Sequence, residues 1–249
     1  MQKVMGYMRK AIQEFDMIKD GDRIAVGVSG GKDSLVLLSG LMGLQRYIGI
    51  DYSLVAITLD PRFDGIDGDY SAVAELCESK GVEYKLIPTD IGQIVFGIRQ
   101  ESNPCSLCAK MRRGALHEAA KESGCNKIAL GHHYNDAVET FVMNLFNEGR
   151  IGCFSPVSYL SRRDLTMIRP MVLAPEKEII RAANRLDLNV VKSRCPADGH
   201  TSRQKTKLFL EELEKNDRGI TERIFGAMRR ADVDGWAGKK FQNYEIKRD

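Results

Sequence analysis

The chain has 249 residues, of which 43% are hydrophobic and 29% are charged, and its formal net charge is +3. This composition excludes collagen-like, disordered and disulfide-stapled small proteins, and it predicts one large globular domain with at most a small appendage. No run of eighteen apolar residues occurs, and residues 1–22 lack the apolar stretch of a signal peptide, so we expect a cytoplasmic protein without a membrane partner.

Apolar runs alternate with helical patterns along the first 150 residues. The expected strands are 24–28, 54–59, 83–87 and 127–130, and the expected helices are 35–44, 70–80, 110–123 and 136–146. Strands and helices that alternate in this way predict an α/β fold, a twisted parallel sheet with helices on both faces. Such sheets bind their ligands at the carboxyl ends of the strands.

The pattern changes after Gly149. Residues 150–172 look irregular apart from a possible strand at 166–168, a helix is expected at 175–186, and helical patterning dominates 202–231 before a loosely ordered tail at 232–249. We therefore expect an α/β domain at 1–174, followed by a mainly helical C-terminal region at 175–249.

A glycine-rich hexapeptide follows the first expected strand directly and precedes a helix. It comprises Ser29, Gly30, Gly31, Lys32, Asp33 and Ser34. Glycines let the backbone approach an anion closely, and the N–H groups at a helix start point toward it. The hexapeptide is not a Walker A loop, because Asp33 stands where that motif has Ser or Thr after Lys. It predicts a phosphate-binding loop of another kind.

This hexapeptide resembles the PP-loop of the N-type ATP pyrophosphatases. The resemblance implies that the loop binds ATP with Mg²⁺, and that the enzyme transfers AMP to a substrate oxygen while releasing pyrophosphate. It also implies that Leu59 and Asp60, after the second strand, lie beside the adenine. A segment after the fourth strand is similar to the superfamily's G-H-x-x-D-D, and its residues are Gly131, His132, His133, Tyr134, Asn135 and Asp136. Asn135 replaces the first Asp, so Asp136 is the expected magnesium-side or phosphate-side residue.

Six cysteines are too few for a disulfide scaffold in a chain of this length. Cys105 and Cys108 form a C-x-x-C, which in a cytosolic protein predicts a metal or redox site. The four remaining cysteines stand alone in the sequence: Cys77, Cys125, Cys153 and Cys195.

The C-x-x-C segment at 103–114 resembles that of the TtcA family, the tRNA 2-thiocytidine synthetases, and further matches lie at 127–136, 168–170 and 223–228. In that family three cysteines hold a 4Fe-4S cluster and leave one iron without a protein ligand. The resemblance assigns the ligands to Cys105, Cys108 and Cys195. Many relatives carry a second C-x-x-C at the third position, but here Asp198 stands where its second cysteine would be.

The sequence leaves two other interpretations of the cysteines open. Thiolates suit zinc as well as iron–sulfur clusters, so Cys105, Cys108 and Cys195 are also zinc ligands in principle, with His200 as a fourth. Alternatively, the C-x-x-C is a redox pair without a metal. We expect Cys77, Cys125 and Cys153 to be ordinary, partly buried residues.

Basic residues supply the remaining candidates. Arg112 follows the C-x-x-C, and we expect it, with Asp33 and Asp136, to act in catalysis. Arg169 matches the family's Arg-Pro at a strand end, and we expect it to bind ATP or RNA. Between Arg162 and Lys205, ten Lys or Arg stand against five Asp or Glu, an excess that suits a polyanion.

Taken together, the motifs predict an ATP-dependent, iron–sulfur-dependent tRNA sulfurtransferase. It would adenylate a pyrimidine carbonyl oxygen, that of cytidine, and replace it with sulfur from a cysteine desulfurase or free sulfide. A homodimer is expected from the family resemblance. One alternative is a related adenylating enzyme with a nitrogen nucleophile, as in lysidine or amide synthesis. Another is a non-enzymatic iron–sulfur protein that binds RNA.

Overall fold

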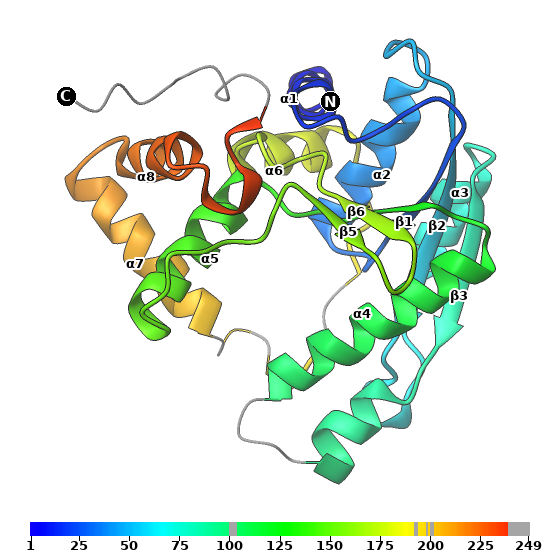
Figure 1. The fold of residues 1–249 in the computed structure, drawn as a ribbon. Helices are drawn as coiled ribbons and strands as arrows, with labels where there is room; N and C mark the ends of the chain where they lie inside the picture. The colour runs from blue at the N-terminus through cyan, green and yellow to red at the C-terminus, as the bar shows by residue number, and fades with distance from the viewer. Residues whose placement is uncertain (100–103, 192–193, 198, 200–201, 239–249) are drawn as a thin grey trace.

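A six-stranded sheet runs through the centre of the molecule (Figure 1). The computed structural model describes residues 1–99, 104–191, 194–197, 199 and 202–238. The strands are β1 (Asp22–Gly27), β2 (Tyr52–Asp60), β3 (Glu83–Pro88), β4 (Lys127–Ala129), β5 (Val157–Leu160) and β6 (Leu165–Ile168). Their order across the sheet is β3-β2-β1-β4-β6-β5. All neighbours pair in parallel except β5 and β6, which form an antiparallel edge.

Eight α-helices are found in the described part of the chain. They are α1 (Gln2–Glu14), α2 (Lys32–Leu44), α3 (Ser71–Glu78), α4 (Pro104–Glu122), α5 (Tyr134–Asn147), α6 (Glu176–Arg185), α7 (Ser202–Asn216) and α8 (Ile220–Arg230). Short 3-10 helices lie at Phe63–Gly65 and Val233–Gly235, and a π-helix lies at Gln93–Arg99. None of the described helices is both long and apolar enough to cross a bilayer.

The two faces of the sheet are buried by different helices. Alternate strand residues point to opposite faces, so Ile24 and Val26 of β1 join a large core with α1, α2, α5 and α6. Ala25 points the other way, into a smaller core that is closed by Ala119 and Ala120 of α4. Strands that are buried on both sides explain the nearly continuous apolar runs in the sequence. The prediction of a parallel sheet with helices on both faces is confirmed.

The strand order places the functional loops. β1 lies between β2 and β4. The chain continues from β1 to β2 on one side of it, and β4 pairs with the opposite side of β1, so the direction in which strands are added reverses at β1. This reversal creates a crevice at the carboxyl ends of β1 and β4, where open α/β sheets bind ligands. The glycine-rich hexapeptide and the segment 131–136 both begin at this crevice.

Two boundaries differ from the sequence-based expectation. α4 begins at Pro104 and not at residue 110, so the C-x-x-C lies in the first turns of a helix. Proline is well tolerated there because the first helical N–H groups have no partner within the helix. The irregular stretch at 150–172 contains β5 as well as β6, and β5 was missed because its partly exposed residues at a sheet edge give no apolar run.

The expected loose tail is partly wrong. Trp236 is fully buried, its Nε1 donates a hydrogen bond to the Phe154 carbonyl at 2.7 Å, and its ring lies against Phe15 and Phe225. Arg229 of α8 forms a buried ion pair with Glu14 of α1. The chain as far as residue 238 is therefore packed onto the N-terminal helix, and residues 239–249 lie outside the described residues.

We expect Trp236→Ala to lower the free energy of unfolding by about 3–5 kcal/mol, because it empties a filled site and leaves the Phe154 carbonyl unpaired. Urea unfolding followed by far-UV circular dichroism measures the loss. Tyr159→Ala is a suitable control, because that ring is 64% exposed. Equal, small losses in both variants would contradict the anchoring role of Trp236.

Candidate functional site

The hexapeptide forms a tight loop between β1 and α2. Gly30 has a φ of +80°, a conformation that side chains with a Cβ rarely adopt. Ser34 Oγ donates to the Gly31 carbonyl at 2.9 Å and accepts from the Ser29 N–H at 3.1 Å. No described side chain caps α2 at Gly31, so the N–H groups of its first turn stay available to an anion. The two serines therefore shape the loop internally around an open helix start.

A second loop, after β4, packs directly on the first. A Cβ built on Gly131 would lie only 3.3 Å from Asp33 C and Ser34 N, so a larger residue there would push the phosphate loop away by a few tenths of an ångström. Two residues later, His133 caps α5, and its N–H donates to Asp136 Oδ2 at 2.9 Å. His133 Nε2 also lies 3.8 Å from Asp33 Oδ1. The structure thus brings Asp33 and Asp136 to one crevice.

Asn135, which replaces the expected acid, has a structural contact. Its Oδ1 accepts a hydrogen bond from the Glu176 N–H at 2.9 Å, in the first turn of α6. An amide oxygen satisfies one of the free N–H groups of that helix start. Asn135 therefore ties the β4 loop to α6.

Two cavities open at the carboxyl edge of the sheet. The first has a volume of about 610 Å³ and is called the histidine cavity here because His117 and His132 line it. Its apolar wall includes Ile57, Leu59 and Leu116, and its polar wall includes Arg169. Apolar walls with a few convergent polar groups are typical of small-molecule sites.

Three buried polar atoms in the histidine cavity have no hydrogen-bond partner among the described residues: His117 Nε2, His132 Nδ1 and Arg169 Nε. Burial and the nearby Arg169 guanidinium lower the pKa of His132 to about 4, so its ring is neutral at pH 7. Arg169 is held at the end of β6 by the Ser155 carbonyl and lies over the Phe154 ring. Unsatisfied buried donors and acceptors are costly, so this wall is suited to a polar ligand.

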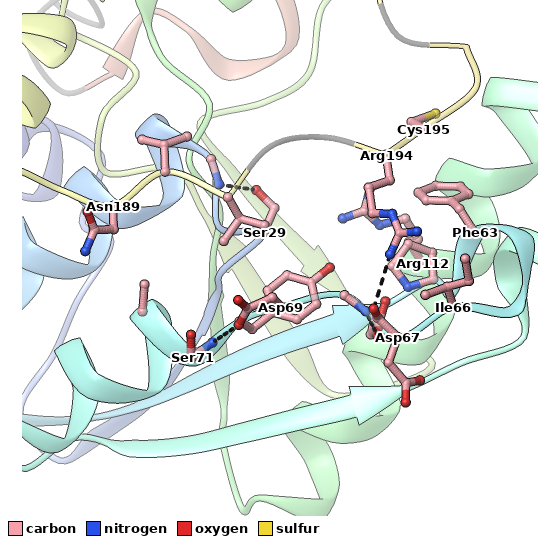
Figure 2. A pocket seen from close by; sticks show the side chains of 18 of the residues that line it. Ser29, Phe63, Ile66, Asp67, Asp69, Ser71, Arg112, Asn189, Arg194 and Cys195 are labelled. Carbon is pink, nitrogen blue, oxygen red and sulfur yellow. Dashed lines mark hydrogen bonds between the residues drawn. The ribbon is translucent and has the colours of Figure 1, made fainter.

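The second cavity, about 640 Å³, is called the cysteine cavity here because Cys108 and Cys195 line it (Figure 2). Asp60 lies on its wall, where its carboxylate accepts from the backbone N–H groups of Arg62 and Gly68 at 3.1 and 2.8 Å. Arg194 donates to the Asp67 carbonyl at 3.3 Å, which holds the segment next to Cys195 against the loop after β2.

The three candidate ligand cysteines are free thiols, and two of them, Cys105 and Cys195, act electrostatically on the third, Cys108. Burial raises the pKa of the Cys108 thiol, and the neighbouring Cys195 and Cys105 raise this pKa further. The nearby Arg112 guanidinium acts in the opposite direction and lowers it. Cys105 itself is exposed. Within the described ranges, no three His, Cys, Asp or Glu side chains are placed closely enough to hold a metal ion as they stand. Two of the thiols line the cysteine cavity, and both Cys105 and Cys195 act electrostatically on Cys108, so the donor set fits a soft metal centre.

The other cysteines and His200 are placed differently. Cys77 and Cys125 are buried in the two cores, and Cys153 is half-buried on the wall of the histidine cavity. Burial raises the pKa of Cys77 to about 11 and that of Cys153 to about 12, so both remain thiols. His200 and Asp198 lie outside the described residues.

Ser29 and Arg112 connect the two cavities, because each lines both of them. Ser29 comes from the end of β1, and Arg112 lies one turn beyond Cys108 on α4. A molecule in the histidine cavity and a group held by the cysteines would therefore meet at these two residues.

Three charged residues near the phosphate loop were not identified from the sequence. Glu176 of α6 pairs with Lys32 at 3.1 Å, and Lys207 of α7 pairs with Glu176 at 2.8 Å. Arg203 of α7 pairs with Asp136 at 3.0 Å. The basic excess counted between Arg162 and Lys205 includes Arg203 without singling it out, and it does not cover Lys207 or the acidic Glu176.

Comparison with known proteins gives a consistent result. A family model described as a PP-loop domain matches residues 4–207. A tRNA-cytidine(32) 2-sulfurtransferase from Geobacter sulfurreducens is 38% identical over 230 residues, which is 91% of this chain and 89% of the relative. The same enzyme from Pelobacter propionicus is 42% identical over 222 residues, 88% of this chain and 82% of the relative.

A solved structure is also similar. The U34-tRNA thiolase NcsA from Methanococcus maripaludis, solved with its 4Fe-4S cluster, superposes with a TM-score of 0.74. It is 28% identical, and the match covers 98% of this chain and 79% of that one. With the loop geometry described above, these similarities show that the chain belongs to the PP-loop family, among the relatives of the tRNA-cytidine(32) 2-sulfurtransferases.

Proposed function

We propose that this protein thiolates a cytidine of tRNA, with ATP as the activating substrate. The observation that carries the proposal is the junction at Ser29 and Arg112, where the cavity beside the phosphate loop meets the cavity of the cysteines. Thiolation needs an activated carbonyl and a sulfur source at one point, and this junction provides such a point. The sulfurtransferase relatives support the same assignment.

The nucleotide would occupy the phosphate loop and the histidine cavity. The open start of α2, with Ser29, Gly30, Gly31, Lys32 and Ser34, would bind the phosphates, because N–H groups at a helix start favour an anion. Leu59 lies at the end of β2 on the apolar wall of the histidine cavity, where the adenine would pack. The next residue, Asp60, lines the neighbouring cysteine cavity. Asp33 and Asp136 carry the carboxylates that would hold Mg²⁺, a cation that prefers oxygen ligands.

The proposed chemistry has two displacements. The cytidine O2 attacks the α-phosphorus, the bond to the bridging oxygen breaks, and pyrophosphate leaves. Sulfide then attacks C2, the C–O bond breaks, and AMP leaves with that oxygen. Arg112 lies at the junction of the two cavities. There it would stabilise the negative charge that develops on the α-phosphate, because a fixed cation at that point lowers the barrier. His132 and Arg169 line the histidine cavity and would bind the nucleotide there, and Gly131 would keep the β4 loop against the phosphate loop.

Cys105, Cys108 and Cys195 would hold a 4Fe-4S cluster, as the thiol donor set and the cluster of the similar thiolase support. Three thiolates leave one iron without a protein ligand, and when bound the cluster would supply a site that keeps sulfide close to the junction. The sulfide would come from a cysteine desulfurase or from the free pool. We also propose that the protein works as a homodimer, on the family resemblance alone.

The direct test of this function is nucleoside mass spectrometry of tRNA. We expect 2-thiocytidine in tRNA from cells that carry the gene and none in tRNA from cells that lack it. Restoring the gene with Asp33→Ala should not restore the nucleoside. Unchanged 2-thiocytidine after deletion, or loss of a different nucleoside instead, would contradict the proposed substrate.

The site of ATP cleavage provides a second test. With tRNA present, the products should be AMP and pyrophosphate, because the loop is a PP-loop without the Walker A sequence. Ser34→Ala should lower turnover by about 10²-fold, since the hydroxyl shapes the loop through Gly31 and Ser29. Thin-layer chromatography of α-labelled ATP distinguishes the products, and ADP with orthophosphate would refute adenylation.

The cysteines provide a third test. Protein prepared without oxygen should contain iron and show broad visible absorption. Cys105→Ala, Cys108→Ala and Cys195→Ala should each abolish both the absorption and thiolation. Cys125→Ala is the matched control, because this cysteine is buried in the core beside α4, and it should keep both. A protein with stoichiometric zinc, no iron and full activity would refute the cluster.

A further inference from the structure

Helix α7 presents two cations to the phosphate-loop side of the sheet. Arg203 and Lys207 lie one turn apart on α7, which packs against α5. Arg203 contacts Asp136 at 3.0 Å and Thr140 at 3.0 Å, both on α5. Lys207 contacts neither of these residues but reaches the start of α6, where it pairs with Glu176. The two cations therefore lie in the crevice without belonging to either motif.

Glu176 is shared by two ammonium groups. Its Oε2 lies 2.8 Å from Lys207 Nζ, and its Oε1 lies 3.1 Å from Lys32 Nζ. Burial would raise the pKa of Glu176, but hydrogen bonds from Lys207 and Lys32 outweigh it and lower the pKa to about 2. The carboxylate is therefore ionised at pH 7 and only 16% exposed, so its charge must be balanced from nearby.

Lys32 is the ammonium group of the phosphate loop, and in this structure carboxylates hold it. Its Nζ lies 3.0 Å from Asp33 Oδ1 as well as 3.1 Å from Glu176 Oε1. A triphosphate in the loop must compete with these carboxylates for Lys32. Glu176 competes less strongly for Lys32 when another cation neutralises its carboxylate. Lys207 is placed to neutralise that carboxylate.

We propose that Lys207 is a positioning residue for the phosphate loop: by neutralising Glu176, it leaves the Lys32 ammonium available to the triphosphate. Without Lys207, the uncompensated Glu176 carboxylate retains Lys32 and adds negative charge next to the phosphate site. Both effects weaken the binding of a polyanion. The inference deepens the proposed function, because it rests on ATP being bound at this loop.

The test uses the affinity of the full-length protein for α,β-methylene-ATP with Mg²⁺, measured by calorimetry without tRNA. Lys207→Met should raise the Kd roughly fivefold, the size expected from one partly buried ion pair. Lys207→Arg should retain most of the affinity. Lys215→Met is the matched control on the same helix, because Lys215 is 72% exposed and pairs with Glu212 one turn away, and it should leave the Kd unchanged.

The decisive variant is the charge-balanced pair. Glu176→Gln combined with Lys207→Met should restore the Kd to the wild-type range, because the competing carboxylate is gone. If Lys207 instead contacts the phosphate directly, the double variant should bind as weakly as Lys207→Met. If the ion pair is purely structural, the double variant should also bind weakly, because it lacks both partners of that pair. Either result would overturn the proposal. Melting temperatures, recorded in parallel, show whether each variant is folded.

The inference and the proposed function fail in different ways. If the variants follow the expected order but wild-type protein leaves tRNA unmodified, the proposed function is wrong and the inference stands. If wild-type protein thiolates tRNA but the double variant is not rescued, only the inference is wrong. A wild-type protein that does not bind the analogue contradicts both.

Discussion

The candidate site depends on one close backbone contact. The loop after β4 passes so near the phosphate loop that a Cβ at residue 131 would meet the backbone of Asp33 and Ser34. Only glycine fits this approach without a shift of the neighbouring chain. The contact brings His133 and Asp136 next to Asp33, so two loops that are a hundred residues apart form one charged crevice. It requires β1 and β4 to be neighbours, which the parallel strand order provides.

Beside this crevice, the fold places the histidine cavity next to the cysteine cavity, and the two share Ser29 and Arg112. α4 is important here, because one helix carries Cys108 into the cysteine cavity and, one turn later, Arg112 to the junction with the histidine cavity. Cys108 and Arg112 lie close together because they are one helical turn apart on α4. Adenylation and sulfur transfer on one carbonyl therefore need no large movement of the chain in the function we propose.

The C-terminal helices contribute charged side chains to the crevice. α6 supplies Glu176 and α7 supplies Lys207 and Arg203 to the crevice, while Trp236 fastens the chain after α8 to α1 and the Phe154 segment. Phe154 also lines the histidine cavity and lies beneath Arg169. Packing at the end of the chain is thus connected physically to the wall of a ligand cavity.

The sequence by itself determined the parallel sheet, the phosphate loop and the β4 loop. These features follow from local rules: buried parallel strands require continuous apolar runs, and an anion-binding turn requires glycines before a helix. Only the tertiary structure decided that Glu176, Arg203 and Lys207 face the crevice. Charged residues on an amphipathic helix have the same local pattern whether they meet solvent or a binding site. The burial of Trp236 was also decided only by the tertiary structure. Its partners Phe15, Phe154 and Phe225 are distant in the chain and come together only when the helices pack.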